Sequence, residues 1–190
     1  MEDEMKVTEI LGIKVTNKEL IVPNKSGFYH DVLRAWWDNL EIEGCGLIIG
    51  DREEVKTVLK ETYPKITEIF TVEIKGEPDI LWDITEPFSS AKINILYDKD
   101  NFLFDWIICQ AVLEHVIDPV AAMKNMSDLL KPEGSLYIHV PGIKCGQHGF
   151  PIDCYRFMKD SLTAFEKLAV LEMVDLYVND MNLMAFYKKL

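Results

Sequence analysis

Hydrophobic and polar positions alternate most clearly between residues 104 and 142. The short apolar run Phe104–Cys109 predicts a strand that is buried on both faces. Asp118 and Pro119 have the residue types of a helix N-cap and a first helical position, and apolar residues then recur at helical spacing as far as Leu130. A second short strand follows at Ser135–Pro141. The stretch therefore predicts a strand–helix–strand unit with parallel strands.

The same patterns predict elements along the rest of the chain. We expect strands at 40–43, 66–74, 78–84, 170–178 and 183–188, and helices after Asp51 and at 159–168. The last two strands flank a turn at 179–182, which is typical of a hairpin. The pattern predicts an α/β fold: a doubly wound, mostly parallel seven-stranded sheet with one antiparallel strand. We expect residues 1–190 to form a single domain, with 1–35 as an N-terminal extension or lid.

Composition and charge narrow the class of protein. A chain of 190 residues, 48% of them hydrophobic, can form one globular core. Its apolar runs are too short to span a membrane, and its acidic start does not resemble a signal peptide. The four cysteines have neither CxxC nor zinc-ligand spacing, so we expect free thiols, a cytoplasmic location and no metal. The net charge of −12 argues against nucleic-acid binding and favours a neutral or cationic small ligand.

Two glycines follow the expected first strand. Gly44 and Gly46 would form a loop in which the backbone can approach a ligand closely. The next helix carries Asp51, Glu53 and Glu54 in its first turn, and these acids would repel a pyrophosphate. The three-glycine spacing of dinucleotide-binding loops is also absent. NAD, ATP and a nicotinamide oxidoreductase are therefore disfavoured.

Two acids stand at the ends of expected strands. Glu73 follows the second strand, where a carboxylate can accept hydrogen bonds from both hydroxyls of a ribose. Asp83 follows the third, where a carboxylate can accept from an adenine amine. Each can also be read as a solvated acid at the end of a strand.

Two segments resemble a known family. Residues 104–142, FDWIICQAVLEHVIDPVAAMKNMSDLLKPEGSLYIHVPG, and 148–157, HGFPIDCYRF, are similar to the class I S-adenosylmethionine-dependent methyltransferases, in particular the methyltransferase type 11 group. The resemblance implies the Rossmann-like methyltransferase fold and methyl transfer from S-adenosylmethionine to a small-molecule, for example sugar-like, acceptor. It implies no nucleic-acid or membrane partner, and the oligomeric state cannot be read from the sequence.

The resemblance also implies how the cofactor is held. The expected cofactor-binding residues are Glu41, Gly44, Gly46, Glu73, Asp83, Cys109, Gln110 and Ala111. The glycine loop would pass under the methionine and ribose, and 109–111 would line the methyl-donor side. The family expects an acid, an apolar residue and then Gly-x-Gly-x-Gly. Here Glu43 is inserted and Ile48 replaces the third glycine, so a non-catalytic methyltransferase-fold binding or scaffold protein is the alternative.

The chemistry of methyl transfer indicates the candidate catalytic residues. The reaction needs mainly alignment and exclusion of water, and an oxygen or nitrogen acceptor can require a general base. His115, His148 and Asp153 are the expected catalytic residues, because all three belong to loops that follow the strands of the unit at 104–142. His115 can equally cap the helix, and Asp153 can pair with Arg156 to hold its loop.

Overall fold

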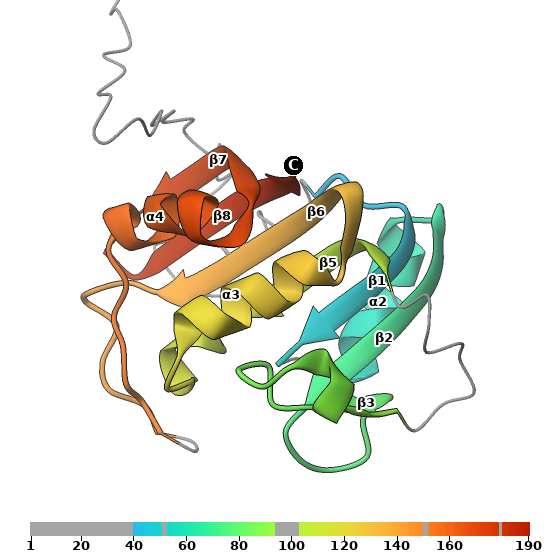
Figure 1. Cartoon of the computed structure of the whole chain (residues 1–190), viewed down its shortest axis with the longest axis horizontal. Coiled ribbons are helices and arrows are strands. Elements are labelled where there is room, and N and C mark those ends of the chain that lie inside the picture. Colours follow the sequence, from blue (N-terminus) through green and yellow to red (C-terminus); the bar gives the residue numbers. More distant parts are fainter. Residues whose placement is uncertain (1–39, 51–52, 94–102, 150–151, 179) are drawn as a thin grey trace, which may run out of the picture.

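The computed structural model describes residues 40–50, 53–93, 103–149, 152–178 and 180–190. One sheet dominates it, with eight strands in the order β4-β3-β2-β1-β5-β6-β8-β7 (Figure 1). The strands are β1 (Gly44–Ile49), β2 (Ile66–Glu73), β3 (Ile80–Leu81), β4 (Lys92–Ile93), β5 (Phe104–Gln110), β6 (Leu130–Pro141), β7 (Leu171–Val178) and β8 (Asn182–Lys189). The helices are α2 (Glu53–Thr62), α3 (Pro119–Asp128) and α4 (Lys159–Ala169), with 3-10 turns at Phe88–Ser90 and Leu113–His115.

The strand directions confirm the expected fold class. β3, β2, β1, β5 and β6 are parallel neighbours, and β8 runs antiparallel to both β6 and β7. The C-terminal hairpin is therefore present as predicted. The eighth strand, β4, pairs antiparallel with β3 and was not predicted, because two residues are too short to show a period.

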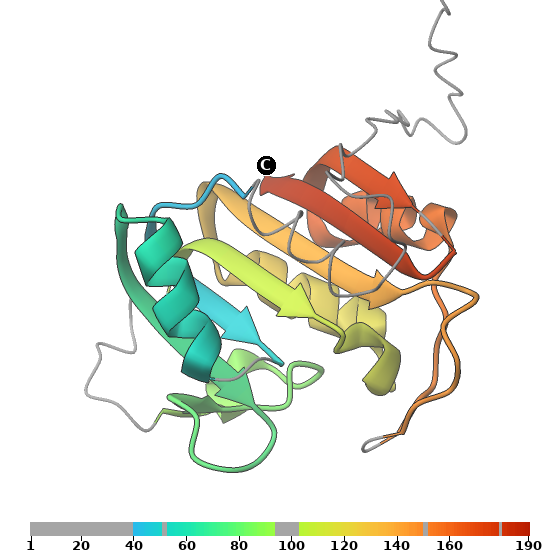
Figure 2. The ribbon, with the colours of Figure 1, turned by 180° about the vertical axis from the view of Figure 1, so that it is seen from behind.

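Helices cover both faces of the sheet. Figure 1 shows α3 and α4 on one face, and Figure 2 shows α2 on the other. Apolar side chains alternate accordingly along the central strands: Leu47 and Ile107 join the core under α3 and α4, whereas Ile48 and Ile108 join the core that contains Leu59 of α2. The near-continuous apolar runs of β1 and β5 follow from this burial on both faces.

The prediction of the first strand is wrong. A strand at 40–43 and a glycine loop at 44–46 were predicted, but Gly44–Ile49 is itself the central strand β1. A Cβ on Gly46 would lie 2.0 Å from the ring of Trp106 on β5, and the Cys45 amide donates to Asp105 Oδ2 at 2.8 Å. The glycines therefore allow two strands to pack closely, which is a known use of glycine within a sheet.

Two smaller departures have local causes. Residues 131–134, between the expected helical stretch and the expected strand at 135–141, lie within β6 as an irregularity, where Glu133 has φ 63° and the register with β5 shifts. The third strand shrinks from 78–84 to Ile80–Leu81. There Asp79 accepts from the Thr71 amide at 2.8 Å and pairs with Lys56 at 2.5 Å, which fixes the loop that leads into β3. The predictions for residues 1–35 and for Asp51 lie outside the described residues.

Candidate functional site

A cleft opens at the carboxyl ends of the parallel strands, as expected for a doubly wound sheet. Its volume is about 260 Å³. The residues that line it come from the ends of β1, β2 and β5, from the segment around β3, and from the 3-10 turn Leu113–His115, which is called the 3-10 turn below. They are Ile49, Gly50, Val72, Glu73, Ile74, Lys75, Trp82, Asp83, Ile84, Ala111, Val112, His115 and Val116. Four residues singled out from the sequence, Glu73, Asp83, Ala111 and His115, therefore border one cavity.

The glycine that borders the cleft is Gly50, which the sequence reading did not select. It has φ 82°, and its amide donates to the Val72 carbonyl at 3.3 Å. A Cβ here would lie 2.0 Å from Cγ2 of Val112, a second cleft residue. The signal in the sequence is a glycine directly after the apolar run 47–49, where a buried parallel strand must end.

The two acidic candidates lie on the same side of the cleft. The backbone of Glu73 accepts from the amide of Trp82 at 3.0 Å, which joins the ends of β2 and β3. Asp83 Oδ1 accepts from the amide and hydroxyl of Thr85 at 3.0 and 2.8 Å. Trp82, missed by the sequence reading, is only 2% exposed and donates through Nε1 to the Glu86 carbonyl. Trp82 is among the residues that border the cleft, so it adds aromatic surface to the wall.

Of the expected methyl-side residues, only Ala111 lines the cleft. It has φ 51°, a left-handed conformation that is unusual for alanine, and its amide donates to the His139 carbonyl at 2.9 Å. Cys109 instead lies fully buried in the core, where burial raises the pKa of its thiol. Gln110 belongs to β5 and is not among the residues that border the cavity.

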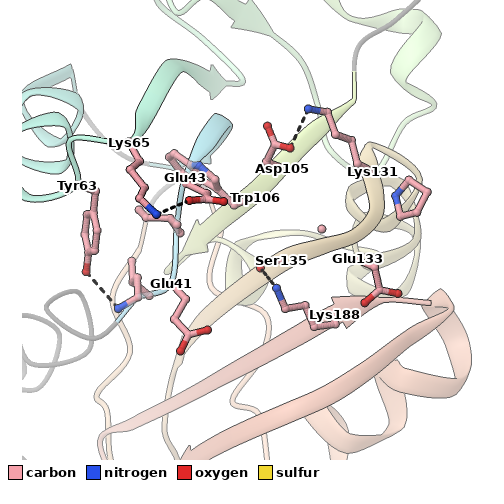
Figure 3. Close-up of a pocket in the computed structure, with 14 residues that line it drawn as sticks. Glu41, Glu43, Tyr63, Lys65, Asp105, Trp106, Lys131, Glu133, Ser135 and Lys188 are labelled. Carbon is pink, nitrogen blue, oxygen red and sulfur yellow. Dashed lines mark hydrogen bonds and ion pairs between the residues drawn. The ribbon is translucent and has the colours of Figure 1, made fainter.

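Glu41, Gly44 and Gly46 lie towards the opposite, amino end of the sheet, because β1 begins at Gly44 and only its last residue, Ile49, borders the cleft. A larger cavity of about 550 Å³ opens at that end, with Glu41 in its wall (Figure 3). Its lysines are all engaged: Lys65 with Glu43 at 3.1 Å, Lys131 with Asp105 at 2.8 Å and Lys188 with Ser135 at 2.8 Å. Glu41, Gly44 and Gly46 are therefore not among the residues that border the cleft at the carboxyl ends of the strands.

A cluster of titratable side chains adjoins the cleft at His115. The His115 and His148 rings meet edge to face with centroids 5.0 Å apart. Glu114, which the sequence reading did not select, is fully buried between them. Burial raises the pKa of Glu114, opposed by the nearby His115, His148 and Arg156. Cys154 brings its loop against the 3-10 turn Leu113–His115, because its amide donates to the Glu114 carbonyl at 2.8 Å.

Asp153 holds this loop together and is poorly suited to act as a base. Arg156 donates to its two carboxylate oxygens at 2.5 and 2.7 Å, and the His148 amide donates to Oδ2 at 2.8 Å. The hydrogen bonds from Arg156 hold the pKa of Asp153 well below its usual range. Arg156 also donates to the carbonyls of Cys145 and Gly146. The pairing of Asp153 with Arg156, left open by the sequence, is present.

This pairing predicts a pH dependence of stability. Because the folded pKa of Asp153 is lowered, its contribution is fully present above the ordinary aspartate pKa and is lost as the pH falls towards the folded value. Asp153→Asn should lower the free energy of unfolding near neutral pH, and the gap to the parent protein should narrow in acid. Urea unfolding at neutral pH and at a pH below the ordinary pKa of aspartate measures both. Asp180→Asn, which removes an exposed ion pair with Lys144, is the matched control.

The comparisons with known proteins agree with this geometry. A family model described as a methyltransferase domain matches residues 20–173, more than half of the chain. The chain belongs to this methyltransferase family. The family belongs to the class I S-adenosylmethionine-dependent methyltransferases, as the sequence resemblance implied. S-adenosylmethionine is the cofactor of these enzymes. A search among curated proteins found no match.

Solved structures show that the methyltransferase shares its fold with distant relatives. A complex between the Haloferax volcanii Trm112 methyltransferase activator and a methyltransferase matches at 11% identity, covering 82% of this chain and 88% of that chain, with a TM-score of 0.62. A Clostridium acetobutylicum S-adenosylmethionine-dependent methyltransferase matches at 13% identity, 83% and 88% coverage and a TM-score of 0.55. The N-methyltransferase NodS from Bradyrhizobium japonicum matches at 17% identity, 77% and 85% coverage and a TM-score of 0.52.

The cleft of the methyltransferase has residues that suit the chemistry of its cofactor. It offers carboxylates for hydroxyl and amine donors, an aromatic wall and a glycine that lets the backbone approach a ligand. Neither Glu73 nor Asp83 would repel a cofactor that carries a sulfonium and no phosphate.

Within the described ranges, no helix is long and apolar enough to cross a membrane.

Proposed function

We propose that this methyltransferase transfers a methyl group from S-adenosylmethionine to a small-molecule acceptor bound beside the cleft at the carboxyl ends of β1, β2, β3 and β5. The observation that carries the proposal is the convergence of Glu73, Asp83, Gly50 and Ala111 on one open cavity of about 260 Å³. The two departures from the family glycine pattern, Glu43 and Ile48, are not among the residues that border this cavity, and the cavity is open. An open cleft favours an enzyme over a non-catalytic relative of the fold.

Each lining residue has a proposed role. Glu73 accepts hydrogen bonds from the ribose hydroxyls, and Asp83, beside the indole of Trp82, orients the adenine. Gly50 lets the backbone pass close under the methionine part. Ala111, turned by its left-handed backbone, borders the methyl-donor side. When bound, the cofactor supplies a methyl carbon activated by the positive sulfur.

The acceptor side is formed by the 3-10 turn Leu113–His115 and by residues 142–149 and 152–157 of the loop that follows β6. His115 borders the cleft with a side chain that is 14% exposed, and the more exposed His148 stands beside it. We propose that this pair receives the acceptor and controls its proton, while Asp153 positions the loop. N- and O-methyltransferases both occur among proteins of this fold; the histidine pair suits either acceptor atom. A sugar-like acceptor fits a site with several polar side chains.

The cysteines and the net charge bear on the cellular setting that we propose. All four cysteines are free thiols, as expected: Cys45, Cys109, Cys145 and Cys154. Free thiols and an acidic chain support a cytoplasmic, single-domain enzyme that acts on small molecules rather than on nucleic acid or membranes.

Calorimetry with S-adenosylhomocysteine tests the proposal on the full chain. We expect one molecule to bind per chain, together with a rise in the thermal midpoint that grows with ligand concentration. Absence of heat and of any thermal shift at millimolar ligand would favour the non-catalytic alternative. NADH serves as the control ligand, since binding of NADH in place of S-adenosylhomocysteine would point to an oxidoreductase.

A further inference from the structure

Three potential ligand atoms meet beside the cleft without a hydrogen bond among them. Glu114 Oε1 lies 3.6 Å from Nε2 of His115 and 3.6 Å from Nε2 of His148. All three ligand atoms lie within 4.8 Å of one another. Glu114 is 0% exposed, and among the described residues neither of its carboxylate oxygens has a hydrogen-bond partner. A buried carboxylate in this state is unusual, because buried polar groups are nearly always satisfied.

The tautomers of the two histidines follow from their other ring nitrogens. Nδ1 of His115 contacts the carbonyl oxygen of Ile152, and a carbonyl only accepts, so Nδ1 carries the proton. Nδ1 of His148 lies 3.3 Å from the carbonyl oxygen of Gly146, which indicates the same tautomer. Arg156 Nη2 is also 3.5 Å from this Nδ1, but it donates at 2.7 and 2.8 Å to Asp153 and Gly146. In both neutral rings Nε2 therefore carries a lone pair.

A cation would satisfy this arrangement. Two imidazole lone pairs and a carboxylate oxygen form a donor set that zinc, iron(II) and manganese accept, and a two-histidine, one-carboxylate set leaves coordination positions open. Tetrahedral ligands with bonds of about 2.1 Å are about 3.4 Å apart, close to the two separations of 3.6 Å. Hydrogen bonds from the distal ring nitrogens to carbonyls are the usual means of orienting histidine ligands.

We propose that Glu114, His115 and His148 bind one divalent transition-metal ion at the wall of the cleft. The site was missed in the sequence because His148 is 33 positions from His115 and only the fold brings it there. The His148 side chain is 44% exposed, so an ion can enter from solvent. The His115 ring borders the cleft, so an ion held by it would lie beside the acceptor side.

The role of the ion rests on the proposed methyl transfer. Coordination of an acceptor hydroxyl lowers its pKa. His115 and His148 would thus control the acceptor's proton through the ion that they hold, and the proton leaves to solvent. The resulting oxygen then attacks the methyl carbon while the carbon–sulfur bond breaks, giving a methyl ether and S-adenosylhomocysteine. The acceptor class is accordingly a hydroxyl compound able to ligate a metal, such as a phenol or a hydroxy acid.

Cobalt(II) and zinc(II) titrations of the full chain, first stripped with chelator, test the site. We expect one ion per chain, a visible cobalt spectrum with nitrogen and oxygen ligands, and zinc affinity in the micromolar range or tighter. His148→Ala and Glu114→Gln should each weaken zinc binding by at least about 100-fold. His148→Ala alters a surface side chain, which keeps the test valid if Glu114→Gln fails to fold. Cys154→Ala, in the same loop, removes an exposed thiol and should leave affinity unchanged.

The outcomes separate this proposal from the proposed function. Absence of stoichiometric binding, or binding that both substitutions leave intact, would overturn the metal site and indicate that the cluster is held by protons alone. Loss of zinc binding in Cys154→Ala would overturn it too, by assigning the ion to thiols. If the protein binds zinc but not S-adenosylhomocysteine, the metal site is supported and its role in methyl transfer is refuted. If it binds S-adenosylhomocysteine but not zinc, only the metal site is refuted.

Discussion

Gly50→Ala should destabilise the protein and weaken binding of S-adenosylhomocysteine. Gly76→Ala should destabilise the protein less and should leave the binding of S-adenosylhomocysteine unchanged. Both glycines have φ 82°, so alanine at either position pays a similar backbone penalty of about 1–2 kcal/mol. Only at Gly50 would the new Cβ lie 2.0 Å from Val112 Cγ2, while around Gly76 nothing lies within 4 Å. The overlap should add about 1–3 kcal/mol to the loss of unfolding free energy.

Chemical unfolding and calorimetry measure the two effects separately. Displacement of Val112 would intrude on the cleft that both residues line, so affinity for S-adenosylhomocysteine should fall by about tenfold or more, equivalent to about 1.4 kcal/mol. Equal destabilisation by the two substitutions would show that Gly50 is needed for its backbone conformation alone. Full affinity in a folded Gly50→Ala protein would remove Gly50 from the cofactor site.

Glu73→Ala should abolish most of the affinity for S-adenosylhomocysteine while leaving the fold intact. Glu73 is half-buried at the end of β2 and borders the cleft. Hydrogen bonds to a charged group contribute about 1.5–3 kcal/mol, so loss of the ribose contacts should weaken binding by about 10- to 100-fold. Calorimetry at constant pH and salt gives the dissociation constants directly.

Glu77→Ala is the matched control for this experiment. It removes the same charge from an exposed position in the following loop, outside the residues that border the cleft. Its affinity should equal that of the parent protein. If the two substitutions weaken binding equally, the effect of Glu73 is long-range charge rather than contact, and the ribose must be held elsewhere.

The parts of the fold that could be predicted are those whose signal is local. The unit at 104–142 carries its own strand, cap, helical stripe and second strand. β5 and α3 appear where they were expected, and β6 contains the expected strand at 135–141 but begins earlier, at Leu130. The hairpin of β7 and β8 and the helix α4 were predicted for the same reason. Glu73 and Asp83 were found because strand ends in a parallel sheet meet at one edge, a rule that needs no knowledge of side-chain contacts.

The parts that were missed depend on partners that are distant in the sequence. Gly44 and Gly46 resemble a loop until Trp106 is seen lying against the second of them. Gly50 is selected only once β1 is known to end at Ile49. The burial of Glu114 results from His148 and the loop that carries it folding back over the 3-10 turn. Sequence periodicity records which face of an element is apolar, and it does not record which side chain of another element lies opposite.

The pairing of β1 with β5 has a consequence for how the molecule is divided. The strand order places β1 to β4 on one side of this pair and β5 to β8 on the other, so each half of the sheet is a continuous piece of sequence. The cleft lies over the boundary: Gly50, Glu73 and Asp83 come from the first half, and Ala111 and His115 from the second. A ligand in the cleft therefore bridges the halves, so cofactor binding and cohesion of the two halves are thermodynamically linked.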